Sequence, residues 1–361
     1  MSLNIGIIGL PNVGKSTLLN ALTRAGAEAS NYPFCTIEKN VGVTPVPDPD
    51  LVRLERILEP EEAVPTTVQF VDIAGLVAGA SQGEGLGNQF LGHIREVDAV
   101  LHVVRCFEDE NVAHVSGAPD PERDVQIVET ELLLADLATA ERHLENWGKL
   151  VRVGEAGKDE QAAFQRAKEL LEAGTMISGT DLTDKELAIL AEARFLTAKP
   201  SLFLANCGED DPRGEGPLPT ALKVLKGAER VVNAAVGIEE EIAQLPAAEQ
   251  QEFLADLGLA ETALNQVITS SYRLLGLITF YTIANNKLRA WQLPSGHTAP
   301  QAAGKIHSDM ERGFIRAEVM PLIDLLRLGS RHALQEQGLI KTVGRDYVVQ
   351  DRDVVQVHFK V

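Results

Sequence analysis

The chain has 361 residues, 45% of them hydrophobic, and is therefore long enough to fold as two or three domains with buried cores. Its formal net charge of −19 argues against binding nucleic acid through phosphate attraction alone, and we expect no sequence-specific DNA partner. Three cysteines are too few and too scattered for a disulfide framework or a zinc site, and no long apolar run or leader-like start indicates a membrane or secreted protein. We expect a cytoplasmic protein with reduced thiols and no membrane partner.

The first part of the chain alternates predicted strands and helices. Residues Asn4–Leu10 form a short apolar run that ends at Gly and Pro, as a buried parallel strand does, and the helical spacing of KSTLLNALTRAG follows it. Further strands are predicted at Thr67–Ile73, Ala99–Phe107, Ser201–Asn206 and Arg230–Ala234. Strands separated by helical stretches predict an α/β fold with a mostly parallel sheet.

The first strand and helix enclose the sequence GLPNVGKS, which matches the pattern G-x-x-x-x-G-K-[ST] and predicts a P-loop. Small residues let successive backbone N–H groups curve around the β-phosphate at the amino end of a helix. Lys15 then reaches the β- and γ-phosphate oxygens, and the Ser16 hydroxyl binds Mg²⁺. The residues expected to bind nucleotide here are Asn12, Val13, Gly14, Lys15, Ser16 and Thr17.

Two further segments are typical of a nucleotide switch. In NYPFCTIEKN, Thr36 offers a hydroxyl to Mg²⁺ and a backbone contact to the γ-phosphate, an arrangement that is released after hydrolysis. In FVDIAGL, Asp72 is placed to hold Mg²⁺ through water, and the N–H of Gly75 can approach the γ-phosphate because this residue has no side chain. The structural alternatives are a plain turn at Asp72–Gly75 and a polar loop residue at Thr36.

The residue that orients the attacking water is less clear from the sequence. Many P-loop relatives carry Gln directly after the D-x-x-G motif, but this chain has Leu76, which cannot hydrogen-bond water. His114 follows the predicted strand Ala99–Phe107, at the sheet edge where ligands gather, and an imidazole can position or deprotonate water. The alternative is a solvated loop histidine. Lys15 is a second catalytic candidate through its charge, and K⁺ or a partner is a further source of positive charge.

Beyond the third predicted strand lies a segment too long for one crossover connection. Residues Ile127–Val151 and Glu160–Gly174 repeat leucine and alanine at helical spacing, which predicts an antiparallel helical hairpin, with ordinary sheet-covering helices as the alternative. From Ile278 onward the pattern indicates a small α+β domain. The predicted division is residues 1–126 and 200–277 for the nucleotide-binding domain, 127–199 for the hairpin and 278–361 for the terminal domain.

Several motifs together give the sequence a family resemblance. The chain is similar to the Obg-like ATPases, the YchF family within the Obg-related P-loop proteins, through GLPNVGKST, NYPFCTIEKN, DIAGLVAGASQGEGLGNQFL, HVSGAPDPERD and the tail RAWQLPSGHTAPQAAGKIHSDMERGFIRAEV. The resemblance covers nearly the whole chain. It implies a G domain interrupted by a helical hairpin, a C-terminal β-grasp domain of the TGS type, and the ribosome or its large subunit as partner.

The resemblance also aligns the residues that read the base. Guanine readers of this class carry Asn-Lys-x-Asp after the fourth strand, and here Asn206, Cys207, Gly208 and Glu209 stand at these positions. A longer acid misaligns with guanine, whereas Asn206 can pair with an adenine edge. We therefore expect Asn206, Cys207 and Glu209 to contact the base, and ATP to be preferred over GTP. The alternatives are a GTP-using ribosome-assembly factor of the Obg type and a binding module in which nucleotide is only a structural ligand.

Overall fold

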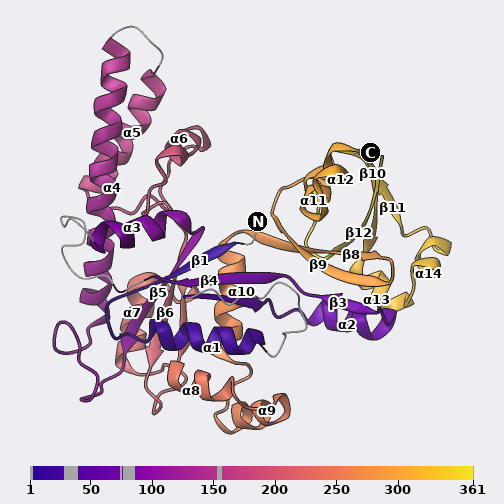
Figure 1. Cartoon of the computed structure of the whole chain (residues 1–361), viewed down its shortest axis with the longest axis horizontal. Coiled ribbons are helices and arrows are strands. Elements are labelled where there is room, and N and C mark those ends of the chain that lie inside the picture. Colours follow the sequence, from indigo (N-terminus) through magenta and orange to yellow (C-terminus); the bar gives the residue numbers. More distant parts are fainter. Residues whose placement is uncertain (1–2, 28–39, 74, 76–85, 153–156, 361) are drawn as a thin grey trace. The chain divides into compact units, whose positions relative to one another are not determined.

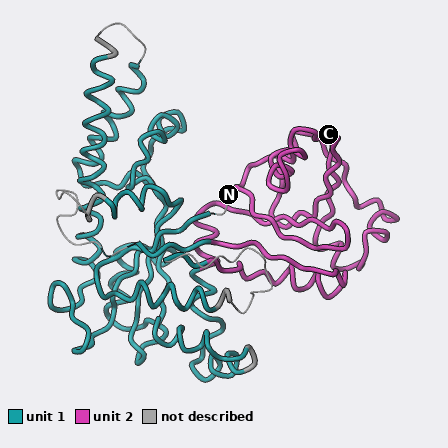
Figure 2. The backbone as a smooth tube through the Cα atoms, in the orientation of Figure 1, with its two compact units in different colours: residues 1–25, 36–42, 69–267 teal, residues 26–35, 43–68, 268–361 magenta. Residues whose placement is uncertain are grey.

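The structure, a computed structural model, describes residues 3–27, 40–73, 75, 86–152 and 157–360. The chain divides into two compact units (Figure 2). Unit 1 comprises residues 1–25, 36–42 and 69–267, and unit 2 comprises residues 26–35, 43–68 and 268–361. Within the described ranges, every helix is too short or too polar to cross a membrane.

Unit 1 is built on a sheet of six strands in the order β2-β4-β1-β5-β6-β7 (Figure 1). Its strands are β1 (Asn4–Ile8), β2 (Val41–Pro45), β4 (Thr67–Asp72), β5 (Ala99–Cys106), β6 (Ser201–Cys207) and β7 (Val231–Ala234). Residues 43–45 of β2 and 67–68 of β4 are assigned to unit 2. The pairs β4–β1, β1–β5, β5–β6 and β6–β7 are parallel. Every residue of β5 is buried, because helices cover both faces of a parallel sheet. The predicted α/β fold is thus confirmed, with strand ends that shift by one or two residues.

The helices of unit 1 include the predicted hairpin. They are α1 (Lys15–Ala27), α3 (Leu86–Glu96), α4 (Pro121–Arg152), α5 (Lys158–Glu172), α6 (Asp184–Leu190), η1 (Ala191–Ala193), α7 (Pro217–Lys226), η2 (Ala228–Arg230), α8 (Val236–Ile242), α9 (Ala247–Asp256) and the start of α10 (Ala263–Leu274). Figure 1 shows α4 and α5 side by side. Phe164 and Leu171 of α5 pack in a common core with Ala140 of α4, so the apolar stripe of the hairpin is an internal core.

Unit 2 holds a mixed sheet of six strands in the order β11-β10-β12-β8-β9-β3. Its elements are α2 (Pro49–Leu58), β3 (Glu62–Val64), β8 (Leu277–Ala284), β9 (Lys287–Pro294), α11 (Ala299–Ile306), α12 (Ser308–Arg312), β10 (Phe314–Pro321), α13 (Leu322–Leu328), α14 (Arg331–Glu336), β11 (Lys341–Val343) and β12 (Asp353–Phe359). The central β12–β8 pair is parallel, and the β8–β9 and β10–β12 pairs are antiparallel. This is the small α+β domain that the sequence predicts.

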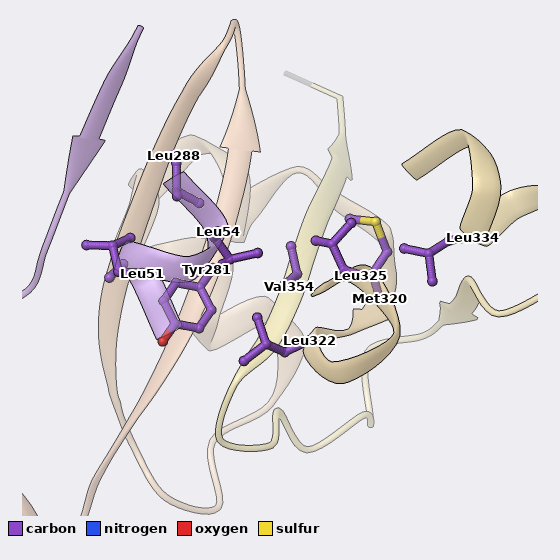
Figure 3. Close-up of a cluster of buried hydrophobic side chains, with 10 residues drawn as sticks. Leu51, Leu54, Tyr281, Leu288, Met320, Leu322, Leu325, Leu334 and Val354 are labelled. Carbon is purple, nitrogen blue, oxygen red and sulfur yellow. The ribbon is translucent and has the colours of Figure 1, made fainter. Parts of the chain in front are cut away.

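Helix α2 belongs to unit 2, although it lies far from the terminal strands in sequence. Leu51 and Leu54 of α2 join Tyr281, Leu322 and Val354 in one buried cluster (Figure 3). Asp48 caps the helix through the amides of residues 50 and 51, and both its carboxylate oxygens accept from the Tyr281 hydroxyl at 3.0 Å.

The division into units differs from the predicted one in three ways. The hairpin, which we predicted as a separate domain over residues 127–199, lies within unit 1. Residues 43–68, which we placed in the nucleotide-binding domain, contribute α2 and β3 to unit 2, and the second boundary falls after residue 267 instead of 277. The physical reason is the apolar face of α2, which is buried against side chains that follow more than 200 positions later. Neither the hydrophobic period of a helix nor its composition identifies a packing partner so distant in the sequence.

Candidate nucleotide-binding site

The P-loop connects β1 to α1 with the backbone geometry that an anion cradle needs. Asn12 and Gly14 adopt positive φ angles of 61° and 98°, and Gly14 accepts the first helical hydrogen bond from Leu18. A β-carbon on Gly14 would collide with Asn206 Nδ2, so only glycine fits. Val13 is buried beneath the loop, and Thr17 lies on the first turn of α1 and lines the cavity described below. The predicted loop residues are thus together at the amino end of a helix, where anions bind.

Lys15 is buried at the base of this loop, with 7% of its surface exposed. Its ammonium donates to the backbone oxygens of Leu10 at 2.7 Å and Gly9 at 3.2 Å. Burial lowers the pKa of Lys15 below its usual value, and the nearby Asp72 carboxylate partly opposes this shift. The loop therefore places a cation with little access to water where negatively charged phosphate oxygens would offset the cost of its burial.

Ser16 and Asp72 are brought together by α1 and the end of β4. The Ser16 hydroxyl donates to Asp72 Oδ2 at 2.7 Å, while Asp72 Oδ1 is buried and has no hydrogen-bond partner among the described residues. A buried carboxylate oxygen without a partner next to a hydroxyl is an oxygen donor set that suits a hard divalent cation. The third residue predicted to bind Mg²⁺, Thr36, lies outside the described residues, as does Leu76.

Gly75 approaches the P-loop closely. A β-carbon at this position would lie 3.1 Å from Lys15 Nζ and 3.2 Å from the backbone nitrogen of Pro11. A side chain here would crowd Lys15 and Pro11, so glycine suits this close approach of the D-x-x-G backbone to the P-loop. The contact of the Gly75 N–H with a γ-phosphate stays a prediction.

A cavity of about 720 Å³ opens beside the P-loop at the carboxyl ends of β1, β5, β6 and β7. Ligands of parallel α/β sheets bind at this edge. Besides the predicted Asn12, Gly14, Thr17, Asn206, Cys207 and Glu209, it is lined by Phe107, Glu108, Asp109, Val112, Gly208, Asp210, Val236 and Gly237. The segment directly after β5 matches no phosphate or base motif, so the sequence predicted no base contact there. Its position directly after a strand of the parallel sheet was the available signal.

Asn206 joins three segments of this cavity. Its Nδ2 donates to the backbone oxygen of Val13 at 2.9 Å, and its Oδ1 accepts from the backbone N–H of Val236 at 3.2 Å. Both ends of the amide that we expected to pair with an adenine edge are therefore bonded to the protein, which leaves one Nδ2 hydrogen and the second lone pair of Oδ1 for a ligand. Asn206 ties the P-loop to the amino end of α8, which a sequence pattern cannot reveal.

We expect Asn206→Ala to lower the free energy of unfolding by about 2 kcal/mol, because it leaves two buried backbone groups without partners. ATP affinity should fall as well, because the Val13 segment of the P-loop loses its tie. Urea unfolding and nucleotide titration measure the two effects. The matched control is Asn233→Ala, because Asn233 also bridges backbone oxygens, those of Arg213 and Gly214, outside the cavity lining. This control should lose stability but keep ATP affinity, and equal losses of affinity would contradict the assignment.

Cys207 and Glu209 present different surfaces to the cavity. The Cys207 thiol is buried and donates to the Ala205 backbone oxygen, and burial followed by the Asp211 charge raises its pKa to about 12. The thiol is therefore neutral and poorly reactive. Glu209 is exposed at the rim, and its Oε1 would lie 3.5 Å from a β-carbon on Gly237. Cys106 and Cys207 are both free, in agreement with the reduced thiols that we expected, and Cys35 lies outside the described residues.

His114 is neither solvated nor free. Its side chain is 1% exposed, its Nε2 lies 2.9 Å from Asp124 Oδ2, and its Nδ1 accepts from the Ser116 N–H at 3.1 Å. Because a carboxylate only accepts, Nε2 carries the proton. Both ring nitrogens are thus engaged by the loop itself, and His114 is not among the residues that line the cavity. Its role in hydrolysis remains a prediction.

Comparison with known proteins identifies relatives of this chain. A family model described as "50S ribosome-binding GTPase" matches residues 4–149, and a model of the YchF GTPase C-terminal region, described as "Protein of unknown function (DUF933)", matches residues 277–360. Two curated proteins named "Ribosome-binding ATPase YchF", from Escherichia coli O157:H7 and Bacillus subtilis, are 47% and 45% identical, each over the whole of both chains.

A solved structure extends this similarity to three dimensions. The YchF GTPase of Schizosaccharomyces pombe is 34% identical and aligns with a TM-score of 0.89, covering 99% of this chain and 98% of its own. These names disagree on the nucleotide, ATP in one case and GTP in the other. They agree on the family. With its P-loop, its parallel sheet and full-length identity to these relatives, the chain belongs to the YchF family of P-loop NTPases.

Proposed function

We propose that this protein is a Mg²⁺-dependent ATPase that prefers ATP over GTP and binds the ribosome as a nucleotide-controlled switch. The observation that carries the enzymatic part is the junction of Lys15, Ser16 and Asp72 at the amino end of α1, beside a cavity large enough for a nucleoside. A triphosphate bound there would meet backbone N–H groups, a buried cation and a magnesium donor set at once.

Magnesium would be held by the Ser16 hydroxyl and, through water, by Asp72, with Thr36 as a further candidate ligand. The bound ion would supply charge neutralisation at the phosphates. The unpartnered Asp72 Oδ1 supports this role, because a buried carboxylate oxygen is costly unless an ion, a donor or water meets it.

The proposed preference for adenine rests on the absence, at Cys207 and Glu209, of the lysine and aspartate side chains with which related proteins bind guanine. Cys207 provides a neutral thiol where guanine readers place a lysine, and Glu209 lies at the rim with a chain one methylene longer than aspartate. Glu209 therefore has a poor position for the paired hydrogen bonds of the guanine N1–H and 2-amino groups. The 6-amino group of adenine needs only one acceptor.

The double substitution Cys207→Lys with Glu209→Asp tests this explanation by restoring the guanine-reading pattern. Steady-state turnover of ATP and GTP, with Mg²⁺ and with EDTA, is the measurement. The wild type should prefer ATP and lose activity in EDTA, and the variant should shift the ATP-to-GTP ratio of kcat/KM toward GTP by about 10-fold or more.

The control for the double substitution is Glu215→Asp, which shortens an exposed acid in the same connection outside the cavity lining. It should leave the ratio unchanged. A wild type that hydrolyses GTP faster than ATP would favour the Obg-type GTPase, and a wild type that binds nucleotide without turnover would favour the purely structural ligand.

Ribosome binding is proposed from the relatives, whose names include it, and from the description of the matching N-terminal family model, which specifies the 50S subunit. Residues from Asn285 onward hold 11 Lys and Arg against 8 Asp and Glu, so the terminal domain is the less acidic part of a chain with a net charge of −19. We expect co-sedimentation with the large subunit to differ between ATP, ADP and no nucleotide. Equal recovery in all three states would exclude a switch.

A further inference from the structure

Arg105 is the largest side chain that the structure buries completely, with 1% of its surface exposed. It lies near the carboxyl end of β5, and among the described residues no hydrogen bond or ion pair joins its guanidinium to an Asp or Glu side chain. Its guanidinium instead donates to three backbone oxygens, those of Phe107 at 3.1 Å, Val112 at 2.8 Å and Asp109 at 3.1 Å. A buried cation that is satisfied only by main-chain oxygens fixes the course of the segment that supplies them.

The same guanidinium also stacks on an aromatic ring of this segment. Its central carbon lies 4.6 Å from the centroid of the Phe107 ring. The Asp109 backbone oxygen accepts from both Arg105 and the Val112 N–H, which tightens the turn between them. Residues 107–112 therefore wrap around one planar group whose donors have a rigid, fork-like geometry, and a lysine ammonium cannot reproduce that geometry.

This segment forms one wall of the nucleotide cavity. Phe107, Glu108, Asp109 and Val112 all line it, whereas Arg105 does not. The next residue, Ala113, is tied to the P-loop through its backbone oxygen, which accepts from Asn12 Nδ2 at 3.2 Å. Arg105 thus holds residues 107–112 of this wall, and the P-loop residue Asn12 holds the next residue, Ala113.

We infer that Arg105 is a positioning residue for the nucleobase. It touches no ligand; it holds Phe107 and Val112 in place before nucleotide arrives, so that a planar base meets a preformed apolar wall. This inference rests on the proposed function in taking the ligand to be a nucleoside triphosphate. It is independent of which purine is preferred, because the apolar surface that Phe107 and Val112 offer, between the acidic Glu108 and Asp109, accepts either ring.

The test measures the contribution of the base to binding separately from that of the phosphates. Arg105→Met and Arg105→Lys are titrated with Mg²⁺ and either ATP or inorganic tripolyphosphate, which carries the phosphates without a base. We expect the affinity for ATP to fall by about 10- to 100-fold in Arg105→Met, and less in Arg105→Lys. Affinity for tripolyphosphate should stay within about twofold, because Lys15 and the P-loop are intact.

Arg230→Met is the matched control. Arg230 also stacks on a phenylalanine, Phe203, at 5.6 Å and donates to the backbone oxygen of Ser201, but it acts at the amino ends of the strands, away from the cavity lining. Its affinity for ATP should match that of the wild type. Unchanged ATP affinity in both Arg105 variants overturns the inference, and so does an equal loss for ATP and tripolyphosphate.

Two outcomes keep this test separate from that of the proposed function. If the wild type binds GTP more tightly than ATP, the adenine preference fails, but the same comparison of GTP with tripolyphosphate still tests Arg105. If neither variant folds, hydrogen exchange in the wild type decides. The Val112 amide should be protected without nucleotide, because it donates within the segment. Rapid exchange that slows only when ATP binds would show that the wall is not preformed.

Discussion

Replacing Lys15 with methionine is expected to lower ATP turnover by about 10²–10³-fold. The ammonium is the one side-chain cation that the described residues place inside the P-loop, and its burial leaves phosphate oxygens as its best partners. Methionine matches the lysine side chain as far as Cε and keeps much of its packing, but it lacks the ammonium group. Phosphate release at saturating ATP and titration of ATP in the presence of Mg²⁺ measure the effects on turnover and on affinity separately.

Lys199→Met controls for the loss of a buried lysine. The Lys199 ammonium also donates to two backbone oxygens, those of Arg95 and Val97, and burial also lowers its pKa. It lies just before β6, at the amino ends of the strands and away from the phosphate loop. Stability should fall in both variants and turnover only in Lys15→Met. Turnover that falls equally in both would mean that Lys15 acts through folding alone.

The sequence predicts those parts of the site whose geometry is determined within one short segment. GLPNVGKS forms a P-loop because the glycines, the strand before them and the helix after them are all local in the sequence. Asp72 reaches Ser16 because Asp72 ends β4 and Ser16 follows β1, the neighbouring parallel strand. The same logic predicts β1, β4, β5, β6 and β7, since each is a short apolar run bounded by turn residues, whereas β2 of the same sheet was not predicted.

The parts that were missed depend on partners distant in the sequence. Asn206 looks like a base reader in a one-dimensional motif, yet its amide joins Val13 and Val236, which lie 193 and 30 positions away. In the sequence, Arg105 is a single charged residue in an apolar strand with no evident partner. Its partners are three carbonyl groups of the following loop, which only the structure shows. Helix α2 has an ordinary amphipathic pattern, which predicts that one face of the helix is buried but does not identify the strands that cover that face.

We expect His114→Ala to lower kcat by about 10²-fold with little change in KM, if the imidazole acts on the attacking water. The structure gives this prediction a specific atom. Asp124 holds the proton on Nε2, so Nδ1 carries the one lone pair of the ring, which already accepts from the Ser116 N–H. Nδ1 can act on water only once this hydrogen bond is released. An Asp that fixes the tautomer of a neighbouring histidine is a common device for making the other ring nitrogen a base.

Asp124→Asn should therefore reduce kcat as well, because an amide that donates toward Nε2 favours the other tautomer and occupies Nδ1 with a proton. His307→Ala is the control. His307 Nδ1 likewise accepts from a main-chain N–H, that of Asp309, and lies near the side-chain carboxylate of Asp309, but this histidine belongs to unit 2. A higher KM with unchanged kcat in the His114 variant would indicate that the ring supports the adjoining wall at Ala113. Full activity in both His114 and Asp124 variants would limit the pair to holding the loop, and the water would then have to be oriented by another group.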